Sequence, residues 1–417
     1  MTKQTFFNIH NLKTITKNIG HLSILKFMTI ILPLATYPYL IRVLGPNIYG
    51  TIIFAQSIIV YFSIILNFGF NIYGTKVIAE NRDDIKKISY LFSSVTIIKL
   101  LLFVLTSIIL LLLILIVPKI NELWLLFLLS YIFSLEEILF PQWYFLGVDK
   151  LNHLTIIGIT SKIVFTILVF SFIRTNSDYL LVPIFQGAGV LFSALITGYI
   201  LKFKEKLKFT IPSFLSLKMI AKESFPLFIS SSSKQVYVNA NRIIIGSFVG
   251  MNEVSYYDLA EKIMNIIKLP VLMMVQAAFP SFTRQKNVKE INKLMVVGVF
   301  FTVVLITMTY LFSNDIIELL GSKKMLKSKS ILNILVISAF LVSISQFMGT
   351  LRMVVFGYIK NFSRIIFNSV IIFGLGFLLL FITSRLNIYS LSWLSVFAEF
   401  YVVVQMTVFL IQKRLIK

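Results

Sequence analysis

The segment Phe225–Gly250, FPLFISSSSKQVYVNANRIIIGSFVG, decides how the rest of this sequence is interpreted. It has about the length that a helix needs to cross a bilayer, yet its middle is polar and cationic. At about 100° per residue, one helical face carries Ser231, Gln235, Asn239 and Arg242. A second polar stripe beside that face carries Lys234 and Asn241. A charge at membrane depth is costly without water or a partner, so the segment predicts a wet cationic cavity between helices, or else snorkelling and structural ion pairs.

The composition is that of a polytopic membrane protein. The 417 residues are 58% hydrophobic and 13% charged, and a soluble domain has about twice that charged fraction. The chain has no cysteine and only three histidines, so we expect no disulfide, no metal site and no cofactor. The net charge of +22 falls mostly between apolar segments, which indicates topology and contact with anionic membrane lipids, with no nucleic acid as partner.

The apolar segments predict an all-α membrane protein of about twelve transmembrane helices, arranged as two six-helix lobes around a central cavity. We expect these spans at 20–41, 50–70, 88–117, 122–146, 154–174, 179–201, 224–250, 255–281, 294–313, 330–356, 363–384 and 389–411. The N-terminal lobe should cover residues 1–200 and the C-terminal lobe residues 224–417, with 201–223 as a basic cytoplasmic linker. Two similar outer turns, RVLGPNIYG at 42–50 and FVGMNEVSYY at 248–257, support two related halves.

Lysine and arginine predict the orientation of the spans. The connections on the side of both termini carry about three times as many of these residues as the opposite side, which places both termini in the cytoplasm. The outer loop 313–329, with four lysines, departs from this pattern. Pro33 and Pro38 predict a bend in the first span, which could be a static kink or a hinge.

Charged residues within the predicted spans are the candidate functional residues. Cations outnumber acids there, and an excess of buried positive charge suits an anionic, phosphate-bearing substrate. The candidate substrate-binding residues are Lys26, Lys99, Lys162, Lys234, Asn239, Arg242 and Arg352. The candidate ion-coupling residues are Glu136, Glu137 and Glu399, which could instead neutralise lysines such as Lys99 and Lys162. Asp258 and Glu261 are expected to form a salt bridge at the rim of the eighth span.

Enzymatic motifs are missing from the sequence. We find no glycine-rich phosphate loop, no HExxH motif and no serine paired with a histidine. The adjacent Glu136 and Glu137 point about 100° apart on a helix and would not form a catalytic carboxylate pair. The sequence therefore predicts a transporter with no catalytic residues.

Three motifs carry a resemblance to a known family. They are PLATYPYLIRVLGPNIYG at 33–50, PQWYFLGVDK at 141–150 and VYVNANRIIIGSFVGMNEVSYYDLAEK at 236–262, the last continued by FPSFTR at 279–284. In order and spacing they resemble Wzx-type polysaccharide flippases of the multidrug/oligosaccharidyl-lipid/polysaccharide exporter superfamily. The resemblance covers nearly the whole chain.

The resemblance implies a function. It implies alternating access in a bacterial inner membrane, moving undecaprenyl-diphosphate-linked O-antigen or capsular oligosaccharide from the inner to the outer leaflet. H⁺ or Na⁺ would drive transport, and an O-antigen polymerase and a chain-length regulator would be partners. The family's cationic cavity maps by position on Lys26, Lys99, Lys162, Lys234, Arg242 and Arg352. Two alternatives stay open: a multidrug or organic-cation exporter of the same superfamily, and a membrane glycosyltransferase such as an O-antigen polymerase or ligase.

Overall fold

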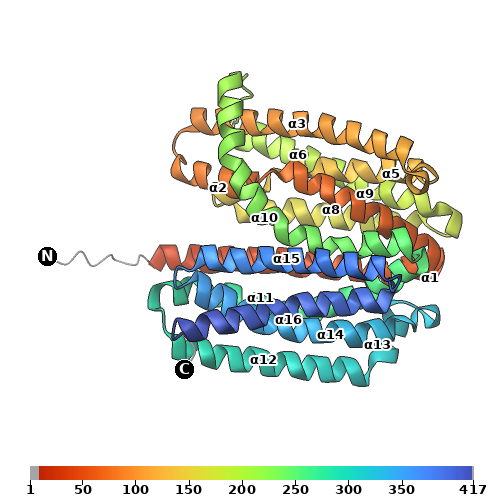
Figure 1. Cartoon of the computed structure of the whole chain (residues 1–417). Coiled ribbons are helices and arrows are strands. Elements are labelled where there is room, and N and C mark those ends of the chain that lie inside the picture. The colour runs from red at the N-terminus through yellow and green to blue at the C-terminus, as the bar shows by residue number, and fades with distance from the viewer. Residues whose placement is uncertain (1–8, 416–417) are drawn as a thin grey trace. The chain divides into compact units, whose positions relative to one another are not determined.

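The computed structural model describes residues 9–415, without side chains at 9–31, 230, 233, 234, 237, 238, 280, 284 and 285. Over the described residues the chain is helical and has no strand (Figure 1), so the predicted all-α membrane fold is confirmed. The first half consists of α1 (Ile9–Asn67), α2 (Phe70–Glu80), α3 (Ile85–Ile116), α4 (Pro118–Asn121), α5 (Trp124–Tyr131), η1 (Ile132–Leu135), α6 (Glu136–Leu139), α7 (Gln142–Gly147), α8 (Leu151–Phe172), η2 (Asn176–Leu180), α9 (Leu181–Tyr199) and η3 (Ile200–Lys204). The second half consists of α10 (Phe214–Phe248), α11 (Met251–Gln285), α12 (Val288–Leu311), α13 (Ser313–Leu320), η4 (Lys323–Met325), α14 (Ser328–Gln346), η5 (Phe347–Val354), α15 (Ile359–Ile382) and α16 (Ile388–Gln412).

The predicted spans coincide with helices or runs of helices. Ten helical stretches among the described residues are long and apolar enough to cross a membrane. Two features explain why ten such stretches are found where twelve spans were expected. The first two spans lie in α1, whose backbone departs from helical geometry at Gly45, with φ 76° and ψ 164°. The seventh span lies in α10, which is not among the ten because its polar middle lowers its hydropathy.

The helices form two compact units. Unit 1 contains the described residues up to Thr36 together with Ile59–Ser231, and unit 2 contains Tyr37–Ile58 together with the described residues from Ser232 onward. This division differs from the sequence-based expectation, which kept 37–58 in the N-terminal lobe and placed the boundary at 201–223. The reason is that residues 37–58 make their contacts with α11 and α13.

In unit 1 the motif at 141–150 is a packing and anchoring element. Trp143 of α7 is 1% exposed, and it lies so close to Gly74 of α2 that a Cβ there would come within 2.5 Å of the indole ring. Beyond α7, Lys150 pairs with Glu205 at 2.6 Å. The hydroxyl of Tyr144 donates to the same carboxylate at 2.9 Å. The motif therefore fixes α7 against α2 and against the segment after η3.

In unit 2 the two similar outer turns meet each other. A Cβ at Gly50 would lie 1.8 Å from the carbonyl oxygen of Met251, so the two backbones touch. The hydroxyl of Ser255 donates to the carbonyl of Pro46. Arg42, the first residue of the 42–50 turn, also donates a hydrogen bond to the carbonyl oxygen of Leu319 in α13, at 2.7 Å. These contacts hold residues 37–58 in unit 2.

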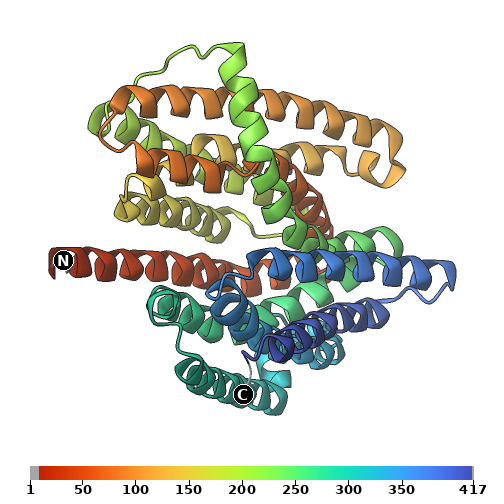
Figure 2. The same ribbon diagram turned by 60° about the vertical axis from the view of Figure 1, so that its left-hand side comes forward.

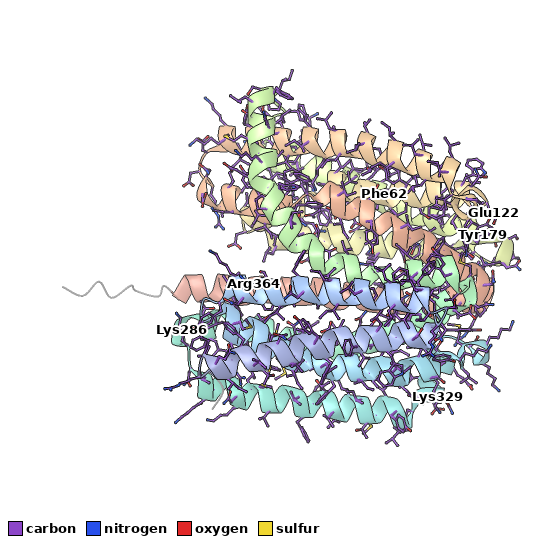
Figure 3. The ribbon with its side chains drawn as sticks, viewed as in Figure 1. Phe62, Glu122, Tyr179, Lys286, Lys329 and Arg364 are labelled. Carbon is purple, nitrogen blue, oxygen red and sulfur yellow. The ribbon has the colours of Figure 1, made fainter. Side chains whose placement is uncertain are left out.

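In unit 2, α14 contacts α11, α12 and α16, and α15 packs on α16. Figure 2 shows α15 and α16, the two blue helices at the C-terminal end of the chain, as neighbouring rods. Basic residues lie at both ends of this unit: Figure 3 shows Lys286 and Arg364 at one end of the helices and Lys329 at the other. This bundle positions the site described next.

Candidate functional site

A buried charge cluster joins α10 to α11 in unit 2. The Nη2 atom of Arg242 lies 2.8 Å from Oε2 of Glu261 and 3.2 Å from Oδ1 of Asp258. The Asp258 and Glu261 residues are 1% and 5% exposed. Asp258 and Glu261 reach one guanidinium because residues three apart share a helical face. Both acids form the predicted salt bridges, but the predicted position at the rim is wrong, since they lie in the interior of the unit.

Lys262 and two tyrosines complete the cluster. Lys262 donates to the second oxygen of Asp258, and its Nζ lies 4.5 Å from the ring centroid of Tyr37. Nζ also approaches the hydroxyl of Tyr49 at 3.3 Å, and that hydroxyl lies 3.5 Å from Asp258. Two cations thus face two carboxylates, with aromatic rings covering Lys262. This balance satisfies the requirement that charges in a low-dielectric interior be paired.

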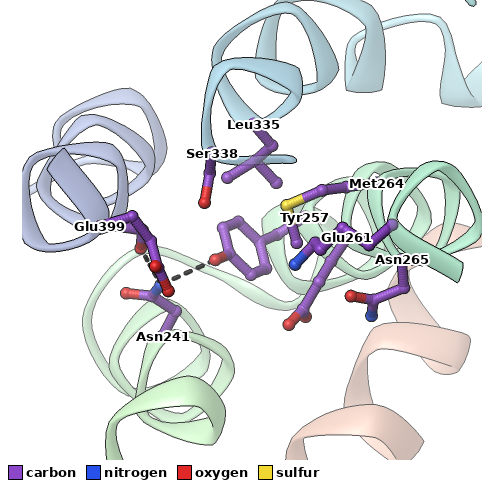
Figure 4. A pocket seen from close by; sticks show the side chains of 10 residues that line it. Asn241, Tyr257, Glu261, Met264, Asn265, Leu335, Ser338 and Glu399 are labelled. Atoms are coloured by element: carbon purple, nitrogen blue, oxygen red, sulfur yellow. Dashed lines mark hydrogen bonds between the residues drawn. The ribbon is translucent and has the colours of Figure 1, made fainter. Parts of the chain in front are cut away.

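A polar cavity adjoins this cluster (Figure 4). It has a volume of about 60 Å³ and is lined from α10, α11, α14 and α16. The lining residues are Asn241, Tyr257, Glu261, Met264, Asn265, Lys268, Leu335, Ser338, Ser395 and Glu399. A cavity of this size holds about two water molecules or a small cation.

Hydrogen bonds define one wall of the cavity. The amide nitrogen of Asn241 donates to the hydroxyl of Tyr257 at 2.7 Å and to that of Ser395 at 2.6 Å. Its carbonyl oxygen, which faces the same cavity wall, has no hydrogen-bond partner among the described residues. Buried polar atoms almost always find a partner, so this atom indicates water or a ligand in the cavity.

Unit 1 has a second charge pair, between α3 and α6. Lys99, which is 2% exposed, pairs with Oε2 of Glu137 at 3.6 Å and donates to the Glu137 carbonyl. That carbonyl is available because its helical partner would be the nitrogen of Pro141, which has no hydrogen. Asn67 donates to the same carboxylate at 3.1 Å. The expected neutralisation of Lys99 by a neighbouring glutamate is confirmed.

The other candidate residues are dispersed. In unit 1, Lys162 lies 5.4 Å from the ring of Phe133 and interacts electrostatically with Glu136. In unit 2, Asn239 donates to the carbonyl of Gln235 at 2.9 Å. Arg352 lies away from the polar cavity, in a groove of its own. The side chains of Lys26 and Lys234 lie outside the described part of the chain.

The structure thus brings together only part of the predicted set. Glu399 and the Arg242 cluster share one site, and Lys99 and Glu137 share another. Sequence reasoning missed Tyr49 and Tyr257 as partners in the unit 2 site, and it placed Asn241 only on the second polar stripe of the 225–250 segment. One signal in the sequence could have indicated the cluster. Asp258 and Glu261 lie on the helix that follows Arg242 and carry the opposite charge.

Comparison with known proteins identifies the family. Residues 15–286 match the family described as polysaccharide biosynthesis protein. The chain belongs to this family. Its resemblance to Wzx-type flippases, stated above on three motifs, is thereby confirmed.

Relatives of this chain match most of its length. A protein of Escherichia coli (strain K12) named "Putative O-antigen transporter" is 27% identical over 380 residues, which are 85% of this chain and 87% of that protein. A protein of the same name from Shigella dysenteriae is 25% identical over 292 residues, covering 69% and 72% of the two chains.

Solved structures show the same fold. An inward-facing multidrug resistance MATE family transporter of the MOP superfamily superimposes with a TM-score of 0.71 at 16% identity, over 95% of this chain and 97% of that one. The lipid II flippase MurJ, in an inward closed conformation, superimposes with a TM-score of 0.70 at 16% identity, over 94% and 87%. The chain therefore has the fold of the MOP superfamily.

Proposed function

We propose that this chain is a flippase for undecaprenyl-diphosphate-linked O-antigen or capsular repeat units. It moves them from the inner to the outer leaflet of a bacterial inner membrane by alternating access, with both termini in the cytoplasm, and without covalent chemistry. The family match over residues 15–286 carries the proposal. The relatives named for O-antigen transport, which cover most of the chain, support its substrate class.

The candidate cations would meet the diphosphate. Lys234 lies on α10 eight residues before Arg242 of the buried cluster, and the neutral candidate Asn239 lies three residues before it. The pairing of Arg242 with two carboxylates suggests a positioning role, in which the cluster holds α10 against α11. Lys234 is then the better candidate for direct contact with phosphate, because ammonium groups are common phosphate partners.

The polar cavity of unit 2 is the proposed coupling site. Glu399 and Glu261 both line it, and Glu261 also binds Arg242. Binding of H⁺ or Na⁺ there would weaken the hold of Glu261 on Arg242 and so change how α10 packs on α11. An ion gradient could bias the conformational equilibrium only through such a difference in affinity between states.

Complementation tests the function. A strain lacking its Wzx-type flippase should regain surface polysaccharide when it carries this chain and a matching repeat-unit cluster. Lys234→Ala and Glu399→Gln should abolish the polysaccharide at normal protein level, while the exposed Lys76→Ala should retain it. Repeat units that stay trapped at the inner face, with wild-type protein in the membrane, would refute the proposal.

One observation favours a second candidate function. The cavity contains two carboxylates, and an organic-cation exporter requires acidic residues where its substrate binds. The same strain separates the two functions. A multidrug exporter would lower the accumulation of organic cations and leave the polysaccharide phenotype unrepaired, whereas a glycosyltransferase of the polymerase class would change chain length on the surface.

A further inference from the structure

Arg352 is a buried cation that has no counter-ion among the described residues. The residue is 3% exposed and lies in the π-helix η5. Its Nη2 atom donates to the side-chain oxygen of Asn292 and approaches the sulfur of Met295 at 3.6 Å, and its Nε atom has no hydrogen-bond partner among the described residues. No carboxylate of the described chain lies within ion-pairing distance. An isolated charge in an apolar interior is among the most costly arrangements a protein can contain.

The guanidinium lines an apolar groove in unit 2. The groove has a volume of about 510 Å³ and runs along α12 beside η5. Its other lining residues are Asn292, Met295, Val296, Val299, Phe300 and Met348. Val296 and Phe300 are each 68% exposed, so the groove opens on the outer surface of the helix. In a membrane span this surface faces lipid.

The position of the groove along the bilayer follows from its neighbours. Asn292 lies on the second turn of α12, and Arg352 lies close to the end of η5. Lys289 and Lys293 are on the first two turns of α12, and Lys286 is at this same end of the unit (Figure 3). The positive-inside rule assigns this basic end to the inner leaflet, whose anionic headgroups it attracts.

We propose that this groove binds one anionic phospholipid of the inner leaflet, with its phosphate on Arg352 and one acyl chain along Val296, Val299 and Phe300. Guanidinium pairs with phosphate oxygens through parallel hydrogen bonds, and Arg352 retains a free Nε donor for that purpose. A single cation matches the single charge of a phosphodiester. The lining offers one carboxamide besides Arg352, which is too few polar groups to hold an oligosaccharide.

Lipid retention tests the proposal. The purified protein is to be examined by native mass spectrometry with added phosphatidylglycerol or phosphatidylcholine, and its melting temperature measured with each lipid. The wild type should retain one phosphatidylglycerol and be stabilised by it, with phosphatidylcholine bound at least about tenfold more weakly. Arg352→Met should lose both effects, and Arg352→Lys should keep part of them. Val299→Trp, which fills the groove, should also lose them.

Matched controls keep the result interpretable. Lys360→Met removes an exposed cation from the same end of the unit and should leave lipid retention unchanged. Arg352→Met replaces an unpaired charge by an apolar side chain, so the delipidated variant should melt at or above the temperature of the delipidated wild type. Equal lipid retention by wild type and Arg352→Met would overturn the proposal. Displacement of phosphatidylglycerol by undecaprenyl diphosphate would overturn it too, because the groove would then belong to the transported substrate.

Discussion

At the scale of the residue, the two acids that pair with Arg242 differ in how many cationic partners they have. Asp258 has two cationic partners, Arg242 and Lys262, whereas Glu261 has one ion-pair partner among the described residues, Arg242. Removal of Arg242 therefore leaves Glu261 as a buried, unpaired charge, while Asp258 keeps Lys262. A buried charge that loses its partner destabilises far more than the intact pair ever stabilised.

This asymmetry predicts an ordered set of stabilities. Arg242→Met should lower the free energy of unfolding by about 3–5 kcal/mol. Adding Glu261→Gln should recover most of that loss, because it neutralises the orphaned carboxylate. Adding Asp258→Asn instead should worsen it, since Lys262 also loses its partner. Melting temperatures in one detergent measure the series, and equal recovery by Glu261→Gln and Asp258→Asn would contradict the assignment.

At the scale of the element, the contact between the turns at 42–50 and 248–257 holds Tyr37–Ile58, a part of α1, in unit 2. Gly45 has a backbone conformation that L side chains rarely adopt, and Gly50 leaves no room for a side chain against Met251. The sequence shows both turns as weak copies of each other. Their contact is what makes Tyr37–Ile58 a part of unit 2.

Gly50→Ala should therefore be destabilising. A Cβ there would meet the Met251 carbonyl at 1.8 Å, and a backbone atom cannot rotate away as a side chain could. Gly374→Ala is the matched control, because nothing lies within 4 Å of its Cβ position in α15. It should be neutral or stabilise by up to about 1 kcal/mol through helix propensity. The melting temperatures of the two variants, measured side by side, test the contact; a Gly50→Ala variant as stable as Gly374→Ala would rule it out.

At the scale of the whole molecule, two compact units are what a transporter with alternating access requires. Each unit has its own buried charge pair: Lys99 with Glu137 in unit 1, and Arg242 with its acids in unit 2. Each pair lies within one unit, so under the proposed alternating access it would hold the helices of that unit together. The proposed coupling ion would act inside unit 2.

Distances between the units should then respond to an ion gradient. The chain has no cysteine, so spin labels can be placed at Asp83→Cys with Lys286→Cys for the inner side, and at Asn176→Cys with Lys324→Cys for the outer side. Double electron–electron resonance in vesicles should show one distance lengthen as the other shortens when a proton or sodium gradient is applied. Two distances that stay constant in both gradients would exclude alternating access of this kind.

The sequence alone determined the helices, the membrane-protein class and the family resemblance. These follow from local properties: hydropathy over about twenty residues, helical periodicity and short motifs. It also offered neutralisation of Lys99 by Glu136 or Glu137 as one of two roles for these glutamates, the other being ion coupling. The expectation that the cationic side chains gather around an anion rested only on the order of charges along the chain, which does not show which of them lie together.

Only the tertiary structure decided which charges meet. Tyr49 and Asp258 are 209 residues apart, and the turn at Gly50 is what brings them together. Arg242 is paired with two acids, whereas Arg352, another cation within a predicted span, has no carboxylate partner among the described residues. Helical periodicity gives the face of a helix on which a side chain lies, but packing between distant segments selects its neighbours, and the neighbours decide whether a buried charge is paired or available to a ligand.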